Sequence, residues 1–384
     1  MINIDWEVVE VKIVNEKKTL FKGNVNQYEK KELEINHLSR VRVIANGHLG
    51  VDISIKNLST LDEQLERAIY RAVKGPKVNF EFGKNINFVP ENNQLFLLTL
   101  KEDWLSLEHP NAIELDQHNV EFYIKTRSGH KLNHQNSRIF VNFGIKHNEY
   151  IPITRIDLYS SGSEPLGLLK NIEILSVNDE TDLFYHPWLF SPLALSGIAL
   201  EKWYNCLTNE NSEIITFPRG VWIKDRGFGL PTDFEGSTKQ PITFVEDGQL
   251  ITKAYDMYSS EMFKTQPTRH NSIYGISIED MLVEPAPTSQ LLDELTFSQK
   301  SYIIITDAYC FPNDNQIEYF IVITLLNKIK KCSREFSKSV LVKLSSINNL
   351  FEKGILCGPV QCGRYPWSSP WLEIQNPLSL FQHL

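Results

Sequence analysis

The sequence lacks several features that define whole classes of protein. Its 384 residues contain no apolar run long enough to cross a bilayer, and the longest run, Tyr319–Leu326, includes a threonine. The cysteines number only five, and the first residues, MINIDWEVVEVK, carry acids where an export signal needs a basic and then an apolar stretch. These absences argue against a membrane-spanning helix and a disulfide-built mini-fold. We expect a cytoplasmic protein with reduced thiols.

Excess positive charge is also missing. The chain has 39 basic and 47 acidic residues, a formal net charge of −8, and no block of five or more basic residues. Because nucleic acids and anionic membranes attract concentrated Lys and Arg, we expect neither as a partner. No repeat of fixed period occurs, which argues against solenoids and propellers. The 42% of hydrophobic residues is ample for the cores of a globular protein.

The residues that are present predict an α+β fold. Asn46-Gly47 divides Val41–Ile55 into two runs of alternating apolar and polar residues. Asn-Gly is a strong hairpin signal because both turn residues accept positive φ. Thr60-Leu-Asp-Glu63 then forms a capping box that predicts a helix over Leu61–Val73, and Gly75-Pro76 ends this helix. The N-terminal part should therefore consist of strands with a packed helix.

A second hairpin and a linker should follow. Val120–Thr126 and Arg138–Lys146 have the pattern of strands, and the polar stretch Arg127–Ser137 lies between them. Turn-forming residues gather after Ser160, where serine, glycine and proline favour exposed backbone. We place a domain boundary between Ser160 and Asp182.

This boundary predicts an N-terminal α+β domain over residues 1–170 and a β-rich C-terminal domain over residues 183–384. In the second domain, Ser191-Pro192 can cap a helix that reaches about Leu207. Asp247-Gly248 predicts a tight hairpin within Ile242–Ala254. Two further apolar runs predict buried strands: Tyr302–Thr306 and Tyr319–Leu325.

The search for chemistry finds few motifs. None of the ten histidines is followed by glutamate, so the His-Glu pair of a zinc-peptidase helix is missing. The nearest spacing, His130 and His134, falls in the expected hairpin loop and lacks a third ligand. Cys357 or Cys362 could act as a nucleophile only with a base such as His270, and unreactive thiols are the alternative. Motifs alone therefore indicate no catalytic residue and no metal ligand on this chain.

Several segments, taken in order, resemble the TldD/PmbA family, in which TldE is another name for PmbA. They span nearly the whole chain, and their order and spacing make the resemblance specific. The segments are Arg40–Gly50, the Leu61–Val73 helix, the helix after Phe190-Ser-Pro192, Gly229–Gly236, Val245–Leu250, Tyr255–Ser260 and Val283–Pro285. The chain resembles a divergent member that is shortened before Phe190 and degenerate around Ile329–Val340.

The resemblance implies a role in peptide proteolysis inside the cell. In this family a zinc-bearing subunit, with a His-Glu-x-x-x-His helix and a C-terminal cysteine ligand, pairs with a sister subunit that lacks these ligands. Here the corresponding helix is Leu195–Trp203, LSGIALEKW, which contains no histidine. Without the two imidazoles, Cys357 and Cys362 have no implied metal role. The chain therefore resembles the TldE/PmbA side.

Our first hypothesis is thus a non-catalytic subunit that binds extended peptides together with a TldD-like partner, and zinc is expected on that partner alone. A substrate maturation step, such as removal of a leader from a ribosomally made peptide, would fit the resemblance. The alternative is a homo-oligomeric peptide-binding or scaffold protein without activity, a homodimer when no partner is present. Turns beside hairpins can present backbone amides to a peptide. The candidate peptide-binding residues are Gly229, Asp233, Glu235, Arg269, His270 and Asn271.

Overall fold

The computed structural model describes residues 3–21, 28–82, 111–146, 150–157, 173–174, 180–227, 232–286, 301–312, 319–326, 337–344 and 346–383. Strands outnumber helices, so the expected α+β class is confirmed. Segment 158–172, which holds most of the expected domain boundary, lies outside the described residues. The division into two domains therefore stays a prediction. None of the described helices is long and apolar enough to span a membrane.

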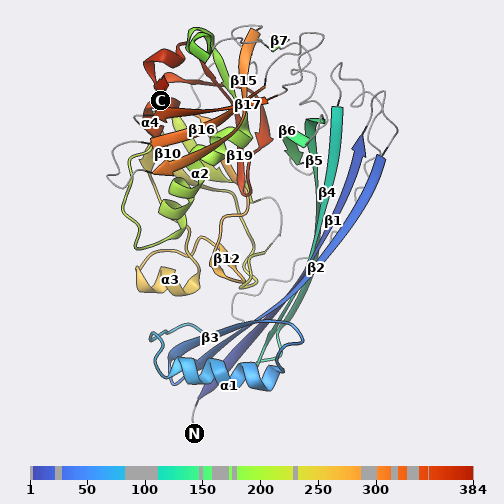
Figure 1. Ribbon diagram of the computed structural model, residues 1–384. Coiled ribbons are helices and arrows are strands. Elements are labelled where there is room, and N and C mark those ends of the chain that lie inside the picture. The colour runs from blue at the N-terminus through green and yellow to red at the C-terminus, as the bar shows by residue number, and fades with distance from the viewer. Residues whose placement is uncertain are drawn as a thin grey trace.

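Long antiparallel strands dominate the N-terminal part (Figure 1). They lie side by side in the order β3, β2, β1, β4, β5, β6. The bounds are β1 Ile4–Phe21, β2 Tyr28–Ala45, β3 His48–Ile55, β4 Asn111–Thr126, β5 Lys131–Lys146 and β6 Tyr150–Asp157. Because successive side chains of a strand point to opposite faces of the sheet, each long strand places its side chains in two different environments. We call the face toward the C-terminal part the inner face.

The sequence located the first hairpin and helix correctly. Asn46 and Gly47 turn β2 into β3 with φ values of 54° and 79°. Helix α1, Leu61–Ala72, begins with the capping box: the Glu63 amide donates to the Thr60 hydroxyl at 3.3 Å, and the Thr60 amide donates to Glu63 at 2.8 Å. Ala68 and Ala72 pack this helix on the outer face of the sheet, against Val8 and its neighbours.

The second hairpin was predicted with the wrong limits. Strands β4 and β5 meet at a short turn over residues 127–130, and the polar stretch assigned to a loop lies mostly in β5. Leu132 and His134 in that stretch are buried, and the residues beside them are exposed or half-buried. Because the side chains on the outer face, and His134 on the inner face, are polar, the sequence does not show the alternation of apolar and polar residues that is typical of a strand. The same correction places His134 in a strand rather than in the expected loop.

The C-terminal part continues the same sheet, because Cys362 of β18 pairs with Arg155 of β6. Beyond β18 and β19 the sheet divides, one branch through β8, β15, β16, β17 and β20 and the other through β14, β9, β10 and β11. The bounds are β7 Glu173–Ile174, β8 Trp188–Phe190, β9 Val221–Asp225, β10 Ile242–Glu246, β11 Gln249–Leu250, β12 Asn271–Ser272, β13 Gly275–Ile276, β14 Met281–Pro285, β15 Ser301–Pro312, β16 Tyr319–Leu326, β17 Ser337–Leu344, β18 Ile355–Cys362, β19 Trp367–Ile374 and β20 Phe381–His383. The expected strands near 302 and 319 and the hairpin at Asp247-Gly248 are confirmed.

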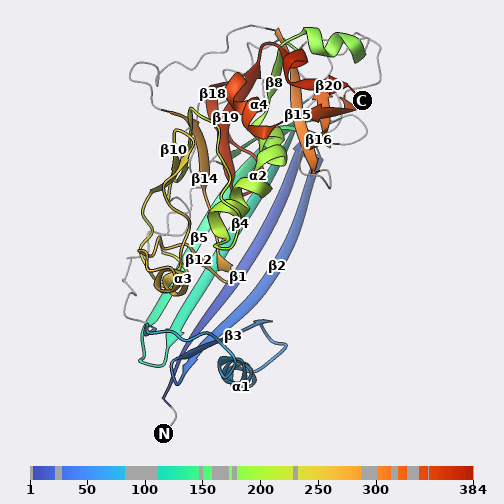
Figure 2. The same cartoon turned by 90° about the vertical axis from the view of Figure 1, so that its left-hand side faces the viewer.

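Helix α2, Pro192–Thr208, crosses this sheet and forms the main core with it (Figure 2). The Ser191 hydroxyl accepts the Ala194 amide at 3.1 Å, which confirms the predicted cap. Shorter helices are α3, Met257–Met262, and α4, Ile347–Lys353, with 3₁₀ turns at Glu180–Tyr185 and Pro377–Ser379. The buried side chains of α2, among them Leu195, Ile198 and Trp203, therefore share one core with the C-terminal sheet.

Gly197 allows α2 to touch β15, and this contact makes a testable prediction. A Cβ at this position would lie 1.8 Å from the Ala308 carbonyl oxygen. Gly197→Ala should therefore push the helix away from the strand and lower the free energy of unfolding by about 1–3 kcal/mol, despite the better helix propensity of alanine. Urea unfolding would measure the loss. Glu201→Ala, on the exposed side of α2, should change stability far less, and equal stability of the two variants would contradict the close approach.

Candidate functional site

Two loops of the C-terminal part pack on the inner face of the long strands. One is the turn over residues 232–237, and the other is the β12–β13 hairpin. Phe234 and Ile273 from these loops share a small core with Val9, Phe122 and Ile124. Phe234 and Phe122 have ring centroids 5.2 Å apart. Beside this core, two of the six candidate residues, Glu235 and Asn271, contact side chains of β2.

Arg42 connects the two parts of the chain by ion pairs. Its guanidinium donates to both Glu7 oxygens, at 2.7 and 2.8 Å, and to Glu235 at 2.7 Å. The second Glu235 oxygen accepts the Met257 amide at 3.0 Å, at the start of α3. The three charged side chains are at most 5% exposed. Such buried, two-sided pairing fixes geometry much more firmly than a surface ion pair does.

Arg40 makes a parallel connection. It donates to the Asn271 side-chain oxygen at 2.7 Å, to the main-chain oxygens of Ser272 and Phe234, and to Glu7 at 3.2 Å. Asn271 in turn donates to Asp256, the N-cap of α3, at 3.0 Å. Both arginines extend from the inner face of β2, because they alternate with the outward Val41. We call Glu7, Arg40, Arg42, Asp233, Glu235, Asp256 and Asn271 the arginine cluster.

Asp233 shapes the turn that carries Glu235. One of its oxygens accepts the amides of Glu235 and Ser237, each at 2.9 Å. Gly236, with φ of 77°, lets the chain turn back tightly enough for this. The aspartate is fully buried, so the turn depends on an acid that has little contact with water.

The arginine cluster contains four buried carboxyl groups and two guanidinium groups. Burial raises the pKa of Glu235 to about 8; the charge of Arg42 opposes this shift, and the charges of Asp233 and Asp256 add to it. Burial likewise raises the pKa of Asp233 to about 6. The carboxylates around Arg42 overcome its own burial and raise its pKa. Arg40, whose burial and proximity to Arg42 oppose its charge, has a pKa lowered to about 10.

These shifts predict a stability that falls with rising pH. The folded state holds protons on Glu235 and Asp233 more tightly than the unfolded chain, whose pKa values are 4.5 and 3.8. Their contribution is therefore complete below pH 4 and is lost as the pH rises through about 6 and then about 8. We expect the urea midpoint to fall from pH 5.5 to 8.5, and Glu235→Gln to flatten this dependence. Parallel slopes for the two proteins would contradict the assignment.

A second buried chain of contacts joins Asp225, His270 and Thr268. The His270 ring nitrogens lie 2.8 Å from Asp225 and 2.9 Å from the Thr268 hydroxyl oxygen. Burial alone would raise the pKa of Asp225, but the hydrogen bond and charge of His270 lower it. The order acid, imidazole, hydroxyl is that of a hydrolase triad. However, the Thr268 oxygen also contacts the main-chain N–H and C=O of Tyr255, and His270 is 2% exposed. These contacts among Asp225, His270 and Thr268 therefore stabilise a loop.

The structure brings the candidate peptide-binding residues together but buries most of them. Asp233, Glu235, His270 and Asn271 are buried, and half-buried Arg269 donates to the Thr238 carbonyl oxygen at 2.6 Å. Gly229 lies outside the described residues. Peptide binding by this set stays a prediction, and two of its members, Glu235 and Asn271, join the two parts of the chain through Arg42 and Arg40.

Sequence reasoning missed Glu7, Arg40 and Arg42, which lie across the interface on β1 and β2, and Asp256 at the start of α3. A signal was available, since two arginines alternating with Val41 and Val43 in a strand must share one face. The burial of this face of β2, however, depends on Glu235 and Asn271, which are far away in the sequence.

The cysteine hypothesis loses support. Cys357 is 1% exposed, and burial, with the nearby charge of Glu373, raises the pKa of its thiol to about 12. Cys362 is also buried. Because the thiolate is the nucleophilic form, Cys357 is poorly suited to attack a substrate.

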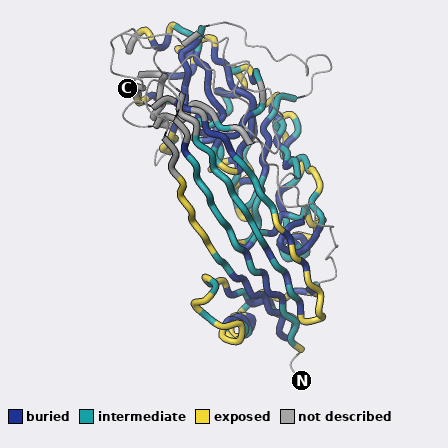
Figure 3. Tube along the Cα trace, turned by 90° about the vertical axis from the view of Figure 1, so that its right-hand side faces the viewer, coloured by how far each residue is buried: buried dark blue, intermediate teal, exposed yellow. Residues whose placement is uncertain are grey.

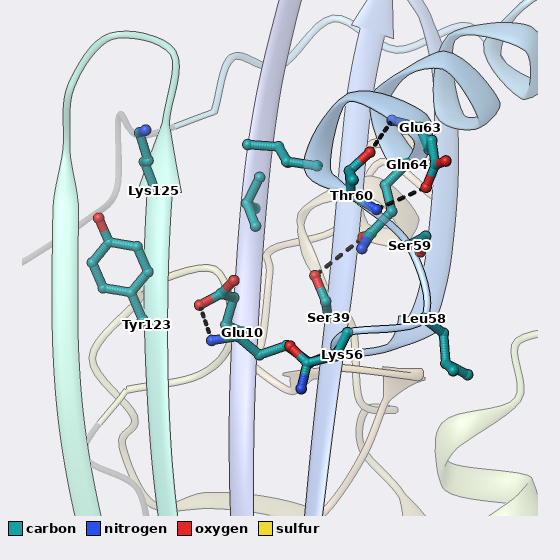
Figure 4. Close-up of a pocket in the computed structure, with 13 residues that line it drawn as sticks. Glu10, Ser39, Lys56, Leu58, Ser59, Thr60, Glu63, Gln64, Tyr123 and Lys125 are labelled. Carbon is teal, nitrogen blue, oxygen red and sulfur yellow. Dashed lines mark hydrogen bonds and ion pairs between the residues drawn. The ribbon is translucent and has the colours of Figure 1, made fainter.

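A cavity of about 770 Å³ lies on the outer face, between α1 and β4 (Figure 4). Its charged and polar groups partly satisfy one another: Lys56 donates to Glu10 at 2.8 Å, and Ser39 donates to the buried Gln64 at 3.1 Å. The sheet separates this cavity from the arginine cluster, so the two are distinct.

The helix that should correspond to the zinc motif is made of packing residues. In α2, Leu195, Ile198, Ala199 and Trp203 are buried in the main core, and Glu201 is exposed. Within the described ranges, no group of three His, Cys, Asp or Glu side chains could hold a metal ion. These residues do not fit a zinc site of the family.

The comparisons with known proteins agree with this architecture. Residues 213–332 match the model of the PmbA/TldA metallopeptidase C-terminal domain. TldE from Thermococcus kodakarensis has a similar structure, with 12% identity, a TM-score of 0.60, and 97% of this chain and 96% of that chain covered. No curated protein matches the sequence.

Two further structures are similar, each described as a candidate modulator of a DNA gyrase. The protein from Thermotoga maritima has 14% identity and a TM-score of 0.57, with 97% of this chain and 95% of that chain covered. The protein from Bacteroides thetaiotaomicron has 13% identity and a TM-score of 0.53, with 99% and 95% covered. The chain therefore has the strand-rich α+β fold of TldE-like proteins. Over residues 213–332 the sequence also matches the PmbA/TldA family model, which supports its resemblance to the TldD/PmbA family.

Proposed function

We propose that this chain is the subunit without metal ligands in a TldD/TldE-like metallopeptidase of the cytoplasm. The observation that carries the proposal is the interior of α2, where Leu195, Ile198 and Trp203 occupy the buried side of the helix expected to bear zinc ligands. A zinc-bearing partner would supply the metal and the water activation. This chain would help to hold the peptide in an extended form.

Reconstitution tests the proposal. The chain alone should not cleave peptides, and adding a TldD-like subunit from the same host should give activity that a chelator removes. Native mass spectrometry of the tagged protein from its host should show a mixed complex that carries zinc. Peptide cleavage by the isolated, metal-free chain would contradict the proposal. A metal-free self-dimer as the only assembly would favour the homo-oligomeric binding protein instead.

A further inference from the structure

The cavity on the outer face has a floor of strands and a wall of loop and helix. Side chains of β1, β2 and β4 form the floor, and the loop over residues 56–60 with the first turn of α1 forms the wall. Figure 3 shows exposed stretches along α1 and the loop before it, beside the buried lower part of the long strands. The volume of about 770 Å³ is within the range of sites that enclose a ligand.

The charges that line this cavity are only partly paired. Its charged side chains, among the described residues, are Glu10, Lys56, Glu63 and Lys125. Lys56 donates to Glu10 at 2.8 Å, so these two neutralise each other. In the described part of the chain, Glu63 accepts a main-chain amide and the Lys125 ammonium lies 5.6 Å from the Trp6 ring centroid, but neither forms an ion pair. Figure 4 shows Lys125 on β4 at one end of the cavity and Glu63 on α1 at the other.

Gln64 presents a buried polar group to the same space. The residue is 3% exposed, lines the cavity, and accepts the Ser39 hydroxyl with its side-chain oxygen at 3.1 Å. No described residue accepts its side-chain N–H groups. Burying an amide nitrogen without an acceptor is unfavourable, and a ligand carbonyl in the cavity would remove this cost. The wall therefore offers a hydrogen-bond donor to a peptide group.

The strand register indicates the length of a ligand that crosses the floor. Tyr123, Glu10 and Ser39 are paired across β4, β1 and β2, so they form one row on the outer face. Two strand spacings of about 4.8 Å separate the ends of this row by about 10 Å. An extended chain rises about 3.3 Å per residue, so about three residues span the row. Such a chain would extend from the Lys125 side of the cavity to the α1 side.

The wall also has an apolar part. Leu58 and Leu61 line the cavity and are 75% and 38% exposed. An apolar side chain placed against them would remove apolar surface from water on both partners. The lining therefore combines a cation, an anion, an amide donor and an apolar surface, which matches the groups of a short peptide.

We propose that this cavity binds a short peptide, about three residues long, whose two termini are unblocked. The peptide carboxylate pairs with Lys125, and its ammonium group pairs with Glu63. A peptide carbonyl accepts from Gln64, and an apolar side chain covers Leu58 and Leu61. This inference goes beyond the proposed function and does not depend on it.

A ligand-observed NMR titration with the tripeptide Ala-Leu-Ala tests the proposal. The unblocked tripeptide should bind with a Kd on the order of 1 mM. Acetylation of its N-terminus or amidation of its C-terminus should each weaken binding about three- to fivefold, because each removes one partly exposed ion pair. No binding of the unblocked tripeptide, or equal binding of the form blocked at both ends, would overturn the proposal.

Protein variants assign each terminus to its partner. Lys125→Met should weaken binding of the unblocked tripeptide about as much as amidation does, and amidation should then have no further effect. Glu63→Gln keeps a side chain that can complete the capping box and should abolish the effect of acetylation in the same way. Lys12→Met is the matched control, because Lys12 pairs with Glu121 at 3.6 Å on the same face and does not line the cavity. This control should bind like the unmodified protein. If amidation weakened binding to Lys125→Met as much as to the unmodified protein, the carboxylate would not lie at Lys125 and the proposal would be wrong.

Discussion

Arg42→Met should lower the free energy of unfolding by about 3–5 kcal/mol, because the buried Glu7 and Glu235 lose the guanidinium that donates to both of them. Both carboxylates are nearly inaccessible to water, so solvent cannot replace the lost partner. The loss should appear as a lower urea midpoint. Hydrogen exchange should also speed up at the Met257 amide, which depends on Glu235.

The control for this prediction lies on the opposite face of the same sheet. Lys56→Met breaks an ion pair with Glu10 whose side chains are 41% and 36% exposed, and should change stability far less. A variant that combines Arg42→Met with Glu235→Gln should recover part of the loss, because the amide at position 235 needs no cation and Glu7 still pairs with Arg40 at 3.2 Å. If Arg42→Met alone were as stable as the unmodified protein, the cluster would not be what holds the long strands to the C-terminal part.

The cluster also shows where sequence reasoning stops. Local signals located the elements: Asn46-Gly47 and Asp247-Gly248 turn hairpins, Thr60 with Glu63 caps α1, and Ser191 caps α2. Each of these depends on residues a few positions apart. Arg42 meets Glu235 across 193 positions, and no local pattern encodes such a meeting. The predicted site was therefore half of an interface, namely the side that turn chemistry could identify.

Strand limits failed for a related reason. The stretch at the start of β5 is polar because its outer side chains face water, while Leu132 alone marks the inner face as apolar. Alternation is clear only when every inward residue is apolar. His134, buried beside the ring of Phe122 at a centroid distance of 5.4 Å, breaks that pattern. In the sequence, a buried histidine in a strand cannot be distinguished from a polar loop residue. Its place becomes clear only when its partner on the neighbouring strand, here Phe122, is known.

Trp203→Ala should lower the free energy of unfolding by about 3–5 kcal/mol. The indole of Trp203 is 1% exposed and lies among Phe217, Phe351 and Trp367, at ring centroid distances of 5.7, 4.8 and 5.5 Å. These three rings come from a loop, α4 and β19, so they cannot collapse easily into the space left behind. Thermal unfolding followed by tryptophan fluorescence would measure the loss, and Trp203→Phe should retain part of the stability.

This prediction also tests the interpretation of α2. A helix that holds catalytic ligands must direct polar side chains into a site that substrate can reach, whereas α2 directs Trp203 and Leu195 into a core that excludes water. Metal binding and core packing would need the same side of α2, the one that carries Leu195 and Trp203. Glu201→Ala, on the exposed side, should leave stability nearly unchanged. If Trp203→Ala were tolerated as well as Glu201→Ala, this side of α2 would not be needed for packing.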